Sequence, residues 1–203
     1  MKGGVAYGAY IKVPATDANY TTTQEAGAAI DVTSEFIATN PEKGGIRFLS
    51  TISEEVAEML LSDYAGATFS FGTLIAPADY VAAAGAFTME ALDKLQVSGV
   101  KYVDIPAVDT FADANGDGIP ESFSGALIKL KSYTRAYAGI SYIKITLLGE
   151  TTYLYGEFDS TINARSAKQV ADAMIADGNS AYYTEYSAEQ KAVVDAYAGK
   201  VSE

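Results

Sequence analysis

The chain contains neither cysteine nor histidine among its 203 residues. It therefore has no disulfide framework and no thiolate nucleophile, and it lacks the most frequent general base and zinc ligand of proteins. These two absences exclude most hydrolase and metalloenzyme mechanisms. Carboxylates remain as acid–base groups, but a glycosidase needs two of them roughly 5–10 Å apart across a cleft, and the sequence pairs no two of them. We expect no enzymatic activity.

Basic residues and long apolar runs are also scarce. The chain has 14 lysines and arginines and 26 acidic residues, which gives a formal net charge of −12. Such a surface repels the phosphates of nucleic acids and of anionic lipids, so neither is an expected partner. No apolar run approaches the roughly 20 residues that span a bilayer, and the first ten residues contain no apolar segment of signal-peptide length. We expect no insertion into a membrane.

The composition indicates a folded protein. Hydrophobic residues make up 49% of the chain and charged residues 20%, a balance that argues against disorder. The length lies below the roughly 250 residues at which chains tend to divide. We therefore expect residues 1–203 to form a single domain.

Hydrophobic patterns predict an α+β fold. Strand-like alternation gives way to helical spacing several times along the chain, and the order of these segments indicates an antiparallel or mixed, sandwich-like sheet with helices on one side. Residues 14–43 read as a long loop with a short strand. The expected strands are 5–13, 44–52, 67–77, 100–105 and 123–131, and helical segments are expected at 53–64 and at 79–95, the latter broken at Gly85.

Two capping boxes predict that the chain closes with two helices. Ser166 is followed three residues later by Gln169, and Ser187 by Gln190. In this motif the Ser hydroxyl and the Gln side chain satisfy backbone N–H groups at the start of a helix. We expect C-terminal helices near 166–177 and 187–199.

A hairpin is predicted over residues 141–158. Two β-rich runs meet at Gly149-Glu150, and Gly suits the first position of a two-residue II′ turn. With this turn, Leu148 would face Thr151 and Thr146 would face Tyr153. One side of the hairpin is then apolar (Ile143, Ile145, Leu147, Leu154 and Phe158), and the other carries Tyr142, Lys144, Tyr153, Tyr155 and Glu157.

The second side of the hairpin is a candidate carbohydrate-binding strip. Sugar rings offer apolar C–H faces to aromatic rings, and Lys144 and Glu157 can bond to sugar hydroxyls. Two alternatives are open. Tyr and Thr are common in strands for packing reasons alone, and a helix can cover the strip.

The stretch DANGDGIPES, residues 113–122, has the spacing of a calcium loop. Asp113, Asn115 and Asp117 offer three oxygen ligands around a Gly-enabled bend, Ile119 a backbone carbonyl, and Glu121 a carboxylate. It is not an EF-hand, because Ser124 occupies the twelfth position where that motif needs Glu. The all-oxygen set favours structural calcium as the cofactor. The alternative is a turn-rich loop that binds nothing.

Two further groups of residues have both a binding and a packing interpretation. Arg135 lies between Tyr133 and Tyr137, where it can grip a ligand or form a structural ion pair. Tyr182, Tyr183 and Tyr186 form a second aromatic cluster. Packing within the fold is the expected role of both groups.

Short motifs spread over residues 5–177 resemble a domain that recurs in secreted, multidomain surface proteins of anaerobic gut and rumen bacteria. They are GAYIKV, GGIRFLSTIS, FGTLIAPADY, FSGALIKL, YTRAYAGISYIK and INARSAKQVADA, which include Arg47, Arg135, Arg165 and Ser166. The resemblance implies an extracellular or cell-surface setting, as a domain without its signal peptide, beside glycan-degrading or dockerin-type modules. It implies no catalytic motif, and the 113–122 stretch is not part of it.

Two functional hypotheses follow. The first is a non-catalytic extracellular module that binds a polysaccharide, favoured by the tyrosine-rich hairpin and by the neighbours of the similar domains. The second is a structural spacer or assembly module of a cell-surface protein that has no small-molecule ligand. The abundance of Ala and Gly and the low charge density favour the second.

Overall fold

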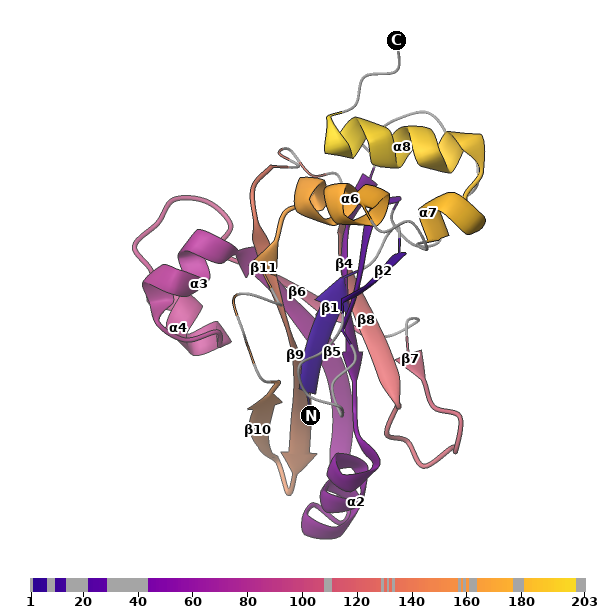
Figure 1. Cartoon of the computed structure of the whole chain (residues 1–203). Coiled ribbons are helices and arrows are strands. Elements are labelled where there is room, and N and C mark those ends of the chain that lie inside the picture. Colours follow the sequence, from indigo (N-terminus) through magenta and orange to yellow (C-terminus); the bar gives the residue numbers. More distant parts are fainter. Residues whose placement is uncertain are drawn as a thin grey trace.

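The computed structural model describes residues 2–6, 10–13, 22–28, 44–107, 111–128, 130, 132, 134–156, 158, 160, 164–176 and 181–199. The fold is α+β: two antiparallel sheets pack against each other, and helices cover their ends and one outer face (Figure 1). The two predicted C-terminal helices are present, with a short helix between them. The predicted fold class is thereby confirmed.

The first sheet, sheet A, is organised around β4. Both β1 and β3 pair along one edge of this strand and β8 pairs along the other, so the path β2-β3-β4-β8-β7 has β1 as a branch. The strand expected at 5–13 is two strands, and the short strand expected within 14–43 is β3. The members are β1 (Lys2–Ala6), β2 (Tyr10–Val13), β3 (Thr22–Ala28), β4 (Gly44–Thr51), β7 (Phe111–Ala112) and β8 (Ser122–Ile128).

The second sheet, sheet B, has the order β10-β9-β5-β6, with β11 also pairing with β9. Its central strand β5 is buried without interruption from Phe71 to Pro77. Sheet A covers one face there and helices cover the other, which explains why this run shows no polar–apolar alternation. The members are β5 (Thr68–Pro77), β6 (Val103–Pro106), β9 (Tyr137–Leu147), β10 (Glu150–Tyr155) and β11 (Ala164–Arg165).

The helices occupy three places around the sandwich (Figure 1). α2 (Glu54–Asp63) lies at one end, while α6 (Ala167–Ala176), α7 (Ala181–Thr184) and α8 (Ala188–Ala198) gather at the other. α3 (Ala78–Ala84) and α4 (Met89–Asp93) pack against the outer face of sheet B and are separated at Gly85, as predicted. No helix among the described residues is long and apolar enough to cross a membrane.

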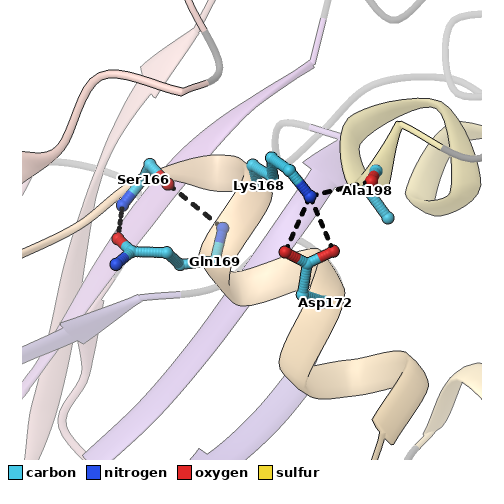
Figure 2. A network of polar contacts seen from close by, with 5 residues as sticks. All are labelled: Ser166, Lys168, Gln169, Asp172 and Ala198. Atoms are coloured by element: carbon cyan, nitrogen blue, oxygen red, sulfur yellow. Dashed lines mark hydrogen bonds and ion pairs between the residues drawn. The ribbon is translucent and has the colours of Figure 1, made fainter.

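The first predicted capping box is present at the start of α6 (Figure 2). The Gln169 N–H donates to the Ser166 hydroxyl over 3.1 Å, and the Ser166 N–H donates to Gln169 Oε1 over 2.8 Å. Lys168 then joins the two C-terminal helices, because its ammonium group contacts Asp172 and donates to the Ala198 carbonyl at the end of α8 over 2.9 Å. A cation at this position satisfies a carbonyl that the helix itself leaves open.

Glycines bring the two sheets into close approach. The Phe48 ring of β4 lies directly over Gly139 of β9, and Thr73 of β5 lies over Gly125 of β8. A Cβ atom at Gly139 would lie 2.1 Å from Phe48 Cδ1, and one at Gly125 would lie 2.6 Å from Thr73 Cβ. Neither glycine needs an unusual φ angle. Each is required because its side of the strand is already filled by the facing sheet.

The hairpin forms, but its register differs from the prediction by two residues. Leu148 and Gly149 occupy the turn with φ angles of 53° and 88°, and Tyr153 pairs with Lys144 instead of Thr146. Two positive φ angles in a two-residue turn indicate the type I′ geometry. This geometry matches the twist of the two strands, and that benefit outweighs the cost of placing Leu148 at a positive φ angle. A shift of two residues preserves which side each residue faces.

One residue of the predicted apolar side is placed differently. Ile143 and Ile145 are buried between the sheets, as expected. Phe158 instead packs edge-on against Phe87 at a centroid distance of 5.1 Å, on the side of sheet B that α3 and α4 cover. β10 ends at Tyr155, so the strand alternation does not extend to Phe158.

We predict that Gly139→Ala lowers the free energy of unfolding by about 1–3 kcal/mol, the usual cost of overpacking a core. Urea denaturation of the variant measures this loss. In a Phe48→Ala background the same substitution is expected to cost less, because the opposing ring is gone. Equal costs in the two backgrounds would contradict the proposed contact.

Candidate functional site

The candidate site lies on the outer face of sheet B, at the edge of the area that α3 and α4 cover, since Tyr142 and Tyr155 pack against the core beneath these helices. Tyr142 and Lys144 come from β9, and Tyr153 and Tyr155 come from β10. Because Tyr155 pairs with Tyr142 and Tyr153 pairs with Lys144, all four side chains project from the same face. The structure thus brings together four of the five residues of the predicted strip. Glu157 lies outside the described residues.

Tyr142 forms the floor of the site and is only 5% exposed. Its ring crosses Gly72 of β5, where a Cβ atom would lie 2.3 Å from the Tyr142 hydroxyl, and that hydroxyl donates to Asp104 Oδ1 of β6 over 2.8 Å. Burial raises the pKa of Tyr142, and this hydrogen bond raises it further by a smaller amount. A ring buried in this way offers no face to a ligand, so Tyr142 supports the site from beneath.

Tyr153 and Tyr155 are the rings that stand above this floor. They are close to parallel, with centroids 6.2 Å apart and 17° between their planes, and Tyr153 meets Tyr142 edge-on at 5.7 Å. Tyr153 is 37% exposed. Tyr155 is half-buried, and its hydroxyl accepts a hydrogen bond from the Met89 N–H of α4 over 3.4 Å. Tyr153 therefore offers the more accessible ring.

Asp104 and Tyr102 complete the site and were not among the residues predicted from the sequence. Asp104 is exposed and lies on β6, on the same face as its partner Leu74. Tyr102 is half-buried, and its hydroxyl lies 3.5 Å from Asp93 Oδ2 of α4. Burial is the main cause that raises the pKa of Tyr102, and the negative charges of Asp93 and Asp104 raise it further. Tyr102 and Asp104 both lie within the expected strand 100–105, and no local pattern connects them to the hairpin.

The acidic loop 113–122 is closed by hydrogen bonds that its own backbone N–H groups donate to its own side chains. Asp113 accepts from the N–H groups of Gly116 over 2.8 Å and Gly118 over 3.0 Å. Asn115 Oδ1 accepts from the Asp117 N–H, and Asp117 Oδ1 accepts from the Ile119 N–H. No group of three or more acidic side chains within the described residues is placed to hold a metal ion.

Ile119 anchors this loop in the core, and the Glu121 side chain adds a further contact within the loop. The Ile119 side chain is 2% exposed and belongs to the core between the two sheets. The Glu121 carboxylate accepts from the N–H groups of Ala114 over 2.9 Å and Asn115 over 3.3 Å. The bond from Ala114 is the main reason that the pKa of Glu121 is lowered. Ile119 thus supplies an apolar anchor that the ligand pattern did not predict.

The two remaining groups have structural contacts. Arg135 forms an ion pair with Asp79 at 3.0 Å and lies over the Tyr80 ring at 5.1 Å. An ion pair was expected inside the fold, but this one lies at the surface. Tyr133 and the side chain of Tyr182 lie outside the described residues. The Tyr183 hydroxyl donates to the Ile175 carbonyl over 2.5 Å, and Tyr186 packs against the core beside α6 and α8.

Comparison of the chain with protein-family models, curated proteins and solved structures finds no match.

We predict that Tyr142→Phe changes the alkaline stability of the protein. The raised pKa means that the unfolded chain ionises this tyrosine near pH 10.0 while the folded protein keeps it neutral. Its contribution to the free energy of unfolding is therefore complete below about pH 10 and is lost as the pH rises further. At neutral pH the variant should be less stable by about 1 kcal/mol, because the bond to Asp104 is gone.

Urea denaturation at several pH values checks this prediction. The stability difference between the two proteins should narrow above pH 10, since only the wild type loses the contribution of Tyr142. Parallel pH profiles above pH 10 would contradict it.

Proposed function

We propose that this protein is a non-catalytic extracellular module that binds a polysaccharide on the outer face of sheet B. The observation that carries the proposal is the pair of near-parallel rings, Tyr153 and Tyr155, above a buried Tyr142 that is fixed to Asp104. Lys144 is the register partner of Tyr153 and lies on the same face of the sheet. The site therefore combines aromatic surface with polar groups that are close to it.

The physical basis is the match between this surface and a sugar. Pyranose rings have apolar C–H faces that pack on aromatic rings, and their hydroxyls need hydrogen-bond partners at the periphery. Tyr153 supplies the accessible ring, and Lys144 and Asp104 supply a donor and an acceptor. Because the floor is bonded before any ligand arrives, little side-chain conformational entropy is lost on binding.

The cellular setting belongs to the same proposal. The resemblance to domains of secreted bacterial surface proteins supports a module that shares its polypeptide with other modules. The charge of −12 supports neutral or cationic partners over nucleic acid. In the alternative, a structural spacer, the same face would bind no glycan.

A structural calcium ion in the loop 113–122 is the second part of the proposal. The donor chemistry fits, because Asp113, Asn115, Asp117, Glu121 and the Ile119 carbonyl are all oxygen ligands. A carboxylate oxygen that accepts one amide hydrogen retains a second lone pair for a cation. The ion would reduce the repulsion between the clustered carboxylates and stabilise the connection between β7 and β8.

We predict that Tyr153→Ala combined with Tyr155→Ala weakens glycan binding by about 2 kcal/mol, or roughly 30-fold in Kd, since each stacking ring contributes about 1 kcal/mol. Titration calorimetry against soluble xylan, mixed-linkage glucan, starch and mucin glycans measures the effect.

Tyr183→Ala is the matched control, because Tyr183 is 46% exposed and belongs to α7, at the other end of the sandwich (Figure 1). It should bind like the wild type. Circular dichroism establishes that each variant is folded. A wild type that binds none of these glycans would favour the spacer, and unchanged binding by the folded double variant would remove this face as the site.

We predict that calcium raises the melting temperature of the wild type. A ligand present at 100 times its Kd stabilises the folded state by about 2.7 kcal/mol. Asp113→Asn combined with Asp117→Asn keeps one oxygen acceptor in each side chain but removes both charges, so the variant should fold and should lose the response to calcium. Differential scanning calorimetry with calcium and with a chelator makes the comparison. An identical wild-type melting curve in both would contradict calcium binding.

A further inference from the structure

Asp104 is an exposed carboxylate that is hydrogen-bonded to the buried floor of the candidate site. It lies on β6, the strand at the opposite edge of sheet B from β10. The Tyr142 ring extends from β9 across Gly72 to reach it, so Tyr142 lies between the Tyr153–Tyr155 pair and this carboxylate. The carboxylate is therefore held at a fixed position beside the aromatic surface.

Its hydrogen-bonding capacity is larger than its contact with Tyr142 requires. A carboxylate has about four lone-pair positions, and the Tyr142 hydroxyl at 2.8 Å uses one of them, on Oδ1. Asp104 is exposed, so the remaining positions are accessible to a ligand. Two hydroxyl groups on adjacent carbons of a sugar can donate to the two oxygens of one carboxylate.

We infer that Asp104 determines the specificity of this site by accepting hydrogen bonds from adjacent hydroxyls of a neutral sugar. The inference rests on the proposed glycan function and adds the class of ligand to it. A negative charge fixed at the site, in a chain with a formal charge of −12, repels carboxylated or sulfated glycans. Asp93 adds a second carboxylate on the α4 side, next to Tyr102. The preferred ligand is a neutral, hydroxyl-rich polysaccharide.

Affinity measurements on Asp104 variants test this inference. The probes are neutral xylan, mixed-linkage glucan and mannan, with polygalacturonate as the acidic glycan. Asp104→Ala should weaken binding of the preferred neutral glycan by about tenfold or more, the usual effect of removing a hydrogen bond to a charged group. Asp104→Asn keeps an acceptor for Tyr142 but removes the charge. It should recover part of that affinity and bind polygalacturonate more tightly than the wild type does.

One comparison and one control separate recognition from structural support. Asp104→Asn keeps an acceptor for the Tyr142 hydroxyl, so a change in preference between neutral and acidic glycans reports on the charge of Asp104 and not on the floor of the site. Glu185→Ala removes an exposed acidic residue next to α7 and should have no effect.

The outcomes distinguish this inference from the proposed function. If Tyr153→Ala weakens binding and Asp104→Ala does not, or if the wild type prefers polygalacturonate, the role of Asp104 is overturned while glycan binding stands. If Asp104→Asn discriminates between neutral and acidic glycans as the wild type does, the pair only supports the floor and the inference is again overturned. If the wild type binds no glycan, both proposals are overturned.

Discussion

The pairing of β5 with β9 is the interaction on which the rest of the structure depends. Ten register pairs, from Thr68 with Thr146 to Pro77 with Tyr137, hold these two strands together. One face of this ladder supplies Phe71, Ile143 and Ile145 to the core between the sheets, and the other supplies residues to the core beneath α3 and α4. The floor of the candidate site is part of the same ladder, because Tyr142 is the register partner of Gly72. Packing, helix placement and site geometry therefore share one set of backbone hydrogen bonds.

Local patterns predicted most of the elements that lie within one segment of the chain. Ser166 and Gln169 identified the start of α6, and Gly85 identified the break between α3 and α4, because capping and left-handed geometry are properties of a few neighbouring residues. The hairpin itself was also predictable. Its register was not, since moving the turn by one residue, from Gly-Glu to Leu-Gly, shifts the pairing by two residues and leaves the same side chains on each face. The two-residue strands β7 and β11 were missed because they are too short to show alternation.

The candidate site could be predicted only in part, for the same physical reason. Lys144, Tyr153 and Tyr155 alternate along one hairpin, so the sequence shows that they share a face. The burial of Tyr142 depends on Gly72, and the position of Asp104 depends on the pairing of β5 with β6. Both relations arise from tertiary structure and connect segments that are distant in sequence. In the acidic loop, spacing revealed the oxygen-rich side chains, whereas the anchoring of Ile119 depends on the apolar space between the sheets.

The glycines that lie beneath larger side chains restrict how this sequence can diverge. Gly139 faces Phe48, Gly125 faces Thr73, and Gly72 faces Tyr142, so each contact fixes the combined volume of two positions rather than the identity of either. A chain with this fold can enlarge one member of such a pair only as the other becomes smaller. The constraint is thus carried by covarying pairs, which leave no contiguous motif. Distant members of such a lineage would be recognised by coupled changes at 48 and 139, at 73 and 125, and at 72 and 142, even after every short motif has been lost.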